Sequence, residues 1–228
     1  MKRVFRLIKK IIIAFIILSI LLVLIFRFIN PPGTMLMVQQ KIADWDGKQV
    51  REWRNFDMIS DNIKIAVIAA EDQNFVNHFG FDVDAIERAI TYNENSQNIR
   101  GASTITQQVA KNLFLWPSRS FIRKGFELWF TLWIELFWSK ERILEVYLNS
   151  VEWGNGIFGI EAAAQYYFNT SAKKLTLGQA SLLAAILPNP RNLSPTHPSQ
   201  NVINKARWIQ EQVKNLDKNS YLNKISSH

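Results

Sequence analysis

The sequence contains no cysteine in its 228 residues, and this absence excludes three kinds of chemistry. Thiolate catalysis, a disulfide framework and a cysteine-based metal site all require the missing side chain. The chain also lacks internal repeats and low-complexity tracts, and it is too short for two catalytic domains. Its apolar residues suffice for one core without disulfide support, so we expect a single domain with an appendage.

Acidic residues are missing from the first thirty positions, and this local absence explains the net charge of the chain. Residues 1–30 hold six of the 27 Lys and Arg residues and no Asp or Glu, which leaves 21 basic and 19 acidic residues beyond them. The formal charge of +8 therefore falls to +2 in the remainder. A nucleic-acid-binding protein is expected to keep its basic excess in the folded part, so we expect no nucleic-acid partner.

The same segment has the features of a membrane anchor. The apolar run Ile11–Phe26 contains Ser19 as its only polar member. Snorkelling of Arg27 extends its usable length to Ile29. A cleaved signal peptide is the alternative, but no small-x-small cleavage pattern follows the run. Five basic residues precede the run and one follows it, which predicts a single crossing of the plasma membrane, a cytoplasmic amino terminus and an outer location for residues 31–228.

Helical periodicity dominates the chain beyond the anchor. Residues 1–30 are expected to form the basic tip and anchor, residues 31–55 a connector that starts at a Pro-Pro-Gly break, and residues 56–228 the domain. A first helix, capped by Ser60, ends at Glu71. Further helices are expected over residues 83–92, 104–113, 121–138, 140–149, 159–168, 176–187 and 200–215. No strand alternation exceeds four residues, so we predict an all-α or α-dominated domain.

Two adjacent carboxylates at the end of the first helix form the most informative segment. Glu71 and Asp72 are followed within nine residues by Phe75, His78 and Gly80. Acids at the carboxyl end of a helix lie at the negative end of its dipole, where ionisation is opposed and a side chain suits proton transfer. A solvated acidic turn with a hydrogen-bonded histidine is the alternative.

A second segment is unusually dense in hydroxyls and amides. Its first helical turn has the register of a capping box, and its polar side chains recur at four-residue spacing. Neighbouring helix faces therefore carry rows of donors, which suit sugar hydroxyls and phosphates, whereas the alternative is an exposed polar helix. The polar residues are Ser103, Thr104, Gln107, Gln108, Lys111 and Asn112.

A third segment places charges inside an otherwise apolar helix. Arg123 and Glu127 are one turn apart, and Lys124 lies between them. Charges in apolar surroundings are costly unless they are paired or bound, so a ligand-lining role is favoured over an internal Arg–Glu pair. A fourth segment, residues 140–149, has the charge spacing of a scaffold helix, and only Lys140 is singled out in it.

Taken together and in this order, the four segments resemble the bacterial peptidoglycan glycosyltransferase family, specifically its monofunctional biosynthetic branch without a penicillin-binding domain. The resemblance covers about residues 55–195, including residues 154–163 and 175–190. It implies a lysozyme-like helical fold, in which a large lobe and a smaller, partly membrane-embedded lobe flank a long cleft.

The resemblance also implies a reaction. In this family the growing lipid-linked glycan is the donor, and lipid II, an undecaprenyl-pyrophosphoryl disaccharide-pentapeptide, is the acceptor. Glu71 corresponds to the general base that deprotonates the acceptor 4-hydroxyl, which gives a β-1,4 linkage with inversion. Glu127 corresponds to a second acid that assists the pyrophosphate leaving group, either through a divalent cation such as Mg²⁺ or Mn²⁺ or through neighbouring bases. The sequence itself requires no cofactor.

The other motif residues are expected to bind substrate. Phosphate oxygens need fixed positive charge, and the candidates for it are Lys111, Arg123, Lys124 and Lys140. Sugars and phosphates would be oriented by Thr104, Gln107, Gln108 and Asn112, while Asp72, Phe75, His78 and Ser103 belong to the same motifs. Four of the eight tryptophans lie between residues 116 and 138, so we expect this region to dip into the outer leaflet, with a plain buried core as the alternative.

Two rival functions remain open at this point. A lytic transglycosylase or lysozyme-type hydrolase would also present a glutamate in a helical cleft, but it would not need a basic cluster. A membrane-anchored scaffold for cell-wall machinery would leave both glutamates without a role. The expected partners are lipid II, the growing strand, the plasma membrane and proteins of cell-wall synthesis or division.

Overall fold

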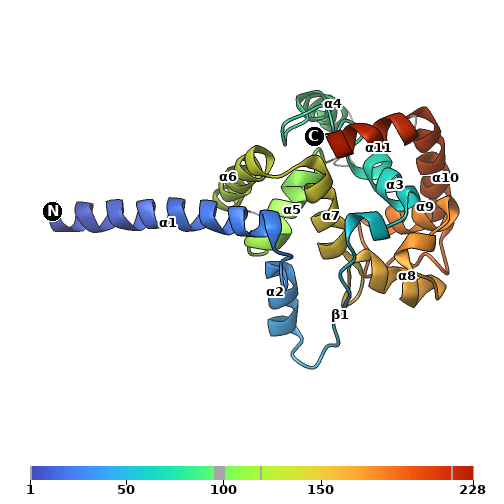
Figure 1. Cartoon of the computed structure of the whole chain (residues 1–228), viewed down its shortest axis with the longest axis horizontal. Coiled ribbons are helices and arrows are strands. Elements are labelled where there is room, and N and C mark those ends of the chain that lie inside the picture. The colour runs from blue at the N-terminus through green and yellow to red at the C-terminus, as the bar shows by residue number, and fades with distance from the viewer. Residues whose placement is uncertain (1, 95–100, 119, 217, 228) are drawn as a thin grey trace.

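The computed structural model describes residues 2–94, 101–118, 120–216 and 218–227. The chain begins with α1 (Lys2–Phe28), a helix that projects from the body of the protein (Figure 1). Most of its apolar side chains are exposed. Within the described ranges, α1 is the one helix that is long and apolar enough to cross a membrane, which agrees with the expected anchor.

Helices make up most of the remaining chain, and the predicted α-dominated fold class is confirmed. In chain order they are α2 (Met35–Ala43), α3 (Asp61–Glu71), α4 (Val83–Glu94), α5 (Ile105–Phe114), α6 (Phe121–Phe137), α7 (Lys140–Ser150), α8 (Ile160–Phe168), α9 (Leu177–Ile186), α10 (Gln200–Asn215) and α11 (Lys218–Ser227). Short 3₁₀ turns, η1 (Phe56–Met58) and η2 (Ala172–Lys174), lie between them. Each helix predicted between residues 60 and 215 is present, with bounds that differ by at most two residues.

The predicted caps explain where the helices of the site begin. The Ser60 side chain accepts a hydrogen bond from the Asn62 amide at the start of α3. Asp82 Oδ1 accepts one from the Ala85 amide at the start of α4. α5 begins with a complete capping box, in which Thr104 is the cap. Each cap satisfies amide groups that lack partners inside the helix, so these starts are fixed by local sequence.

The stretch expected to be a connector is folded onto the domain. Within it, α2 is followed by β1 (Val50–Arg51), which pairs in parallel with β3 (Ile157–Phe158). β2 (Glu152–Gly154) pairs antiparallel with β3 and completes a sheet of order β1-β3-β2. At the β2–β3 turn, Gly156 has φ +72°, and a Cβ there would lie 2.3 Å from the Lys48 carbonyl oxygen. A glycine therefore permits the close approach of the two segments.

Two groups of helices meet in the body of the protein. In one, α3 packs against α9 and α10; in the other, α5 packs against α6 and α7. α3 lies at the centre of its group, because Ile63, Ile65, Val67 and Ile68 are fully buried. Glu71, at the carboxyl end of α3, therefore reaches the second group from a rigid element.

The anchor helix is docked on α6 and the start of α7. Trp129 Nε1 donates a hydrogen bond to Ser19 Oγ at 3.0 Å, and Trp138 Nε1 donates one to the Val23 carbonyl at 2.8 Å. The Arg142 guanidinium donates to the Phe26 carbonyl near the end of α1. Two of the tryptophans expected at a membrane interface therefore bind the anchor helix through their indole nitrogens.

Candidate active site

Glu71 is held from one side by a short chain of hydrogen bonds. Gln108 Nε2, on α5, donates to Glu71 Oε2 at 2.9 Å. The Tyr147 hydroxyl, on α7, donates to Gln108 Oε1 at 3.2 Å. The amide of Gln108 is thus oriented from behind, and the second carboxylate oxygen of Glu71 remains directed to the cavity.

Tyr147 was not singled out in the sequence, yet its surroundings fix its role in this chain of bonds. Burial raises the pKa of the Tyr147 hydroxyl well above its ordinary value, and the negative charges of Glu71 and Asp72 act in the same direction. The hydroxyl therefore stays protonated and remains a donor to Gln108. A tyrosine inside an apolar helical pattern carries no sequence signal for such a contact.

The other residues of the first segment bond to one another within the protein. Asp72 Oδ1 lies 2.8 Å from His78 Nε2, and Asp72 Oδ2 accepts a hydrogen bond from the Ile105 amide at 3.0 Å. Phe75 is fully buried. The bonds of Asp72 join the turn after α3 to the start of α5, and the expected substrate contacts of Asp72, Phe75 and His78 stay predictions.

The start of α5 divides its polar residues between capping and the cavity. Gln107 Oε1 accepts from the Thr104 amide, and Thr104 Oγ1 accepts from the Gln107 amide and donates to the Gly80 carbonyl. Both side chains are buried and hold the cap together, and their expected sugar contacts stay predictions. Asn112 is buried as well, whereas Ser103 is exposed at the cavity.

Glu127 lies buried on α6 between two cations. Arg123 Nη1 donates to Glu127 Oε2 at 2.5 Å, and Lys124 Nζ donates to Glu127 Oε1. Arg123 Nε also donates to the Ser118 carbonyl. The Arg–Glu pair kept as an alternative in the sequence is present, and it holds both cations in fixed positions.

Lys111 lies on α5, three residues after Gln108, within electrostatic range of this ion cluster and of Glu71. It makes no hydrogen bond or ion pair with a described residue, and part of its side chain reaches solvent. Burial of the ammonium group lowers the pKa of Lys111, and the charge of Glu127 opposes that shift. The charge of Glu71 opposes it too, so both glutamates act on the same ammonium group. Among the described residues, Lys111 is therefore a cation without an ion-pair partner that is influenced by both acids.

Lys140 lies elsewhere. Its ammonium group donates to both carboxylate oxygens of Glu135, at 2.8 and 2.9 Å, and to the His78 carbonyl at 2.8 Å. These three acceptors use the three N–H groups, and the side chain is buried. In the structure Lys140 thus forms a buried ion pair, and its expected phosphate contact stays a prediction.

The surroundings of Glu127, the acid expected to assist the diphosphate leaving group, do not fit a metal ion. Both carboxylate oxygens of Glu127 already accept hydrogen bonds from cations. Across the part of the chain that the structure describes, no group of three or more His, Asp or Glu side chains is placed to hold a metal ion. Of the two ways to assist a leaving diphosphate, the donor set favours neighbouring basic residues.

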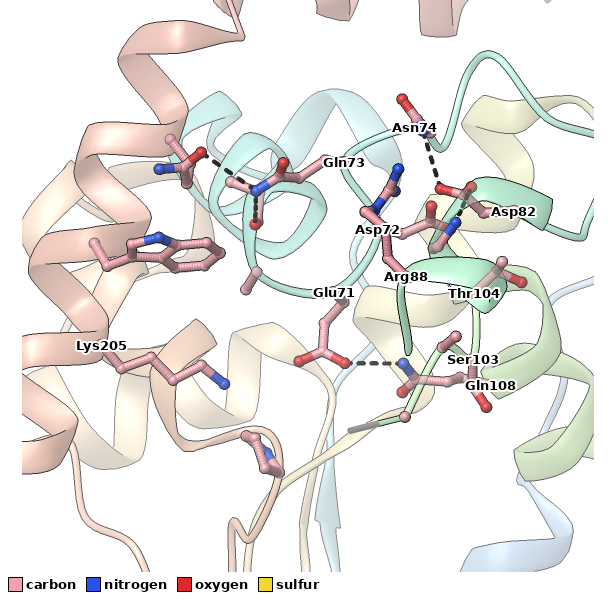
Figure 2. Close-up of a pocket in the computed structure, with 18 residues that line it drawn as sticks. Glu71, Asp72, Gln73, Asn74, Asp82, Arg88, Ser103, Thr104, Gln108 and Lys205 are labelled. Carbon is pink, nitrogen blue, oxygen red and sulfur yellow. Dashed lines mark hydrogen bonds between the residues drawn. The ribbon is translucent and has the colours of Figure 1, made fainter. Parts of the chain in front are cut away.

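A cavity of about 810 Å³ opens beside Glu71. Figure 2 shows the Glu71 carboxylate between Gln108 on one side and Lys205 of α10 on the other. The cavity wall opposite α5 is formed by α10. Sequence reasoning predicted this helix but did not assign its residues to the site, although they recur at three-to-four spacing. The cavity-lining residues that sequence reasoning did not select include Gln73, Arg88, Lys205, Trp208 and Gln212.

Comparisons with known proteins agree with the geometry. A family model described as Transglycosylase matches residues 38–214. A biosynthetic peptidoglycan transglycosylase of Pseudomonas savastanoi pv. phaseolicola is 58% identical over 213 residues, which cover 92% of this chain and 90% of the relative. The relative of that name in Pseudomonas syringae pv. syringae is 55% identical over 231 residues, with 100% and 98% coverage. The one in Pseudomonas fluorescens is 54% identical, with 99% and 96% coverage.

Proposed function

This chain belongs to the transglycosylase family, and we propose that it polymerises lipid II into β-1,4-linked glycan strands by inverting glycosyl transfer. It is a peptidoglycan glycosyltransferase. The observation that carries the proposed mechanism is the place of Lys111 on α5. It lies three residues after Gln108, which bonds Glu71, and its helix packs against α6, which carries Glu127. An acid for proton removal and a site for diphosphate are thereby linked through one side chain.

Glu71 acts as the general base. Gln108 occupies Oε2, which leaves Oε1 to accept the proton of the acceptor 4-hydroxyl. As that proton leaves, the acceptor oxygen forms a bond to the anomeric carbon of the donor. The bond from that carbon to the diphosphate oxygen breaks on the opposite face, and undecaprenyl diphosphate departs. Tyr147 supports this step indirectly, because it keeps the donor end of Gln108 turned toward Glu71.

Lys111, Arg123 and Lys124 stabilise the diphosphate as its negative charge grows. Arg123 and Lys124 are preorganised by Glu127, so little rearrangement is needed when the charge develops. Lys111 has no ion-pair partner in the part of the chain that the structure describes, so it can bind a phosphate oxygen without breaking an ion pair there. Glu127 is thus a positioning residue for two cations, and no step requires it to contact the substrate.

The lipid tail of the substrate enters beside an apolar surface of α6. Phe121 and Ile122 are 97% and 72% exposed, immediately before Arg123 and Lys124. Leu128, Leu132 and Leu136 add a stripe of partly exposed side chains at four-residue spacing. Exposed apolar side chains beside phosphate-binding cations support an outer-leaflet location, with α1 spanning the plasma membrane and its basic tip in the cytoplasm.

Incubation of the purified full-length protein with lipid II tests the function. Polymer formation supports the proposal, and cleavage of preformed strands supports a hydrolase. The absence of both activities supports a scaffold. Glu71→Gln removes the base and should lower the polymerisation rate by roughly 10³-fold, while the thermal melting temperature stays within about two degrees. Retained turnover in this variant would show that Glu71 is not the base.

A further inference from the structure

The proposed chemistry leaves one wall of the cavity without a role. α10 carries two stripes of side chains. The first consists of Val202, Ala206, Ile209 and Val213, which are buried against the core. The second, which we call the α10 wall, consists of Lys205, Trp208 and Gln212, all of which line the cavity. Spacings of three and four residues place these three side chains on one helix face beside Glu71.

Lys205 is the cation of the α10 wall. It makes no hydrogen bond or ion pair with any residue that the structure describes, although Figure 2 shows its side chain extending toward Glu71. Burial lowers the pKa of Lys205, and the charge of Glu71 opposes that shift. A partly desolvated ammonium group costs free energy, and an anionic group in the cavity would offset that cost.

Trp208 supplies a surface of different chemistry next to this cation. Its side chain lines the cavity and remains 38% exposed. A flat aromatic face in a polar cavity suits the C–H face of a sugar ring. Farther along the wall, Gln73 Nε2 lies 3.5 Å from Gln212 Oε1, which joins α10 to the turn after α3.

Besides Glu71, the cavity is lined by two acids, Asp72 and Asp82, and both are engaged away from Lys205. Asp72 is bonded to His78 and to the Ile105 amide. Asp82 accepts from Asn74 and from the start of α4. The α10 wall therefore offers Lys205 to an anionic group of a ligand and Trp208 to a sugar ring.

We propose that the α10 wall binds the acceptor molecule, with Trp208 against a sugar ring and Lys205 against a carboxylate of its peptide. This inference rests on the proposed function. In an inverting displacement the nucleophile approaches from the face opposite the leaving group, and Glu71 acts on that nucleophile. Lys205 and Gln108 approach Glu71 from opposite sides (Figure 2). On the Gln108 side, α5 continues to Lys111, three residues farther along the helix. The α10 wall lies on the side of Glu71 that faces away from the proposed phosphate site, so it is the acceptor side.

The test measures acceptor KM and kcat separately in the full-length protein. The donor is a lipid-linked tetrasaccharide whose terminal 4-hydroxyl is blocked, and the acceptor is lipid II with either free or amidated peptide carboxylates. Lys205→Gln should raise the KM for the free-carboxylate acceptor about tenfold and leave the KM for the amidated acceptor at the wild-type value. Lys205→Arg should restore most of the affinity.

Trp208→Leu should raise the KM for both acceptors about fivefold, because the sugar is common to them. Trp208→Phe keeps a ring, so it should recover part of that loss and also serve if the leucine variant folds poorly. Arg207→Gln is the matched control on α10, since Arg207 is exposed and outside the cavity lining.

Three results would overturn the inference. The first is a KM in Lys205→Gln and Trp208→Leu equal to that of the Arg207 control. The second is an equal loss on both acceptors in Lys205→Gln, and the third is a loss in kcat alone. Failure of the proposed function has a separate signature, in which wild-type protein forms no polymer from lipid II, and that result overturns both.

Discussion

Glu71 stands between two lysines whose surroundings differ. Lys111 lies among the charges of Arg123, Lys124 and Glu127 on α6, whereas Lys205 has Glu71 as the charged neighbour that acts on its pKa. A dense group of cations suits the diffuse charge of a diphosphate. A single cation beside an exposed tryptophan suits a carboxylate attached to a sugar-bearing ligand.

The two sides also differ in rigidity. The cations Arg123 and Lys124 are fixed by Glu127, and the base Glu71 is fixed by Gln108. Preorganised groups contribute most where charge changes during the reaction. The unpartnered Lys205 has no such support, so its contribution is expected in binding. Substitutions on the phosphate side should therefore lower kcat, and substitutions on the α10 wall should raise KM.

The largest effect within this comparison is expected from Lys111→Gln. Loss of an unpaired cation at the developing diphosphate charge should lower kcat about 100-fold. Stability should change little, because no described residue forms an ion pair with Lys111 that the substitution would break. Initial rates at saturating lipid II, together with thermal melts, measure the two quantities.

Lys214→Gln provides the control, since Lys214 is an exposed lysine on α10 outside the cavity lining. A Lys111→Gln variant that loses affinity but keeps its kcat would erase the distinction between the two sides. A large fall in melting temperature would instead assign Lys111 a structural role.

The sequence predicted the helices and the two glutamates because each carries a local signal. Ser60 and Thr104 are caps, and Glu71 and Glu127 lie in dense polar or charged segments. It did not predict the pairing of Lys140 with Glu135, because that contact depends on how α6 turns into α7. Local patterns identify polar residues, but internal partners decide whether those residues are available to a ligand.

The α10 wall was missed in the sequence because its role also depends on tertiary packing. A stripe at positions 205, 208 and 212 is visible in the sequence, but the packing of α10 on α3 and α9 is not. Without that packing, nothing distinguishes a wall beside Glu71 from an ordinary solvated face. Tyr147 was missed for a related reason, since its hydroxyl meets Gln108 only when α5 and α7 are packed.

A smaller effect is expected from Tyr147→Phe. Without the hydroxyl, Gln108 Oε1 loses its donor, and the amide is free to turn its oxygen toward Glu71. We expect kcat to fall about tenfold with little change in KM, in keeping with the loss of one buried hydrogen bond. Steady-state rates with lipid II measure this split.

A double-mutant cycle separates positioning from general destabilisation. If Tyr147 acts through Gln108, then Tyr147→Phe should cost nothing further in a Gln108→Leu background. Additive losses would mean that the hydroxyl supports the fold in some other way and that the chain of bonds behind Glu71 is not functional.

The smallest effect is a shift in pH dependence that distinguishes the two lysines. Burial lowers the pKa of Lys111, so the free enzyme should lose this positive charge at a lower pH than an ordinary lysine would. With the amidated acceptor, which does not use Lys205, kcat/KM should fall on the alkaline side. Lys111→Arg keeps its charge there and should move that fall upward by about one pH unit, whereas Lys205→Arg should not move it.

The pH dependence of stability supplies the control. Loss of the Lys111 charge should lower the activity, but it should raise the free energy of unfolding. A lysine whose pKa is lowered by folding disfavours the folded state while it is charged. That cost is relieved as the pH rises from the lowered pKa to the unfolded value, where the unfolded chain binds more protons. An alkaline loss of activity caused by Lys111 should thus occur without a loss of stability from the same group. If the free energy of unfolding, measured with denaturant, fell in parallel with the rate, the titration of Lys111 would not be the cause of the lost activity.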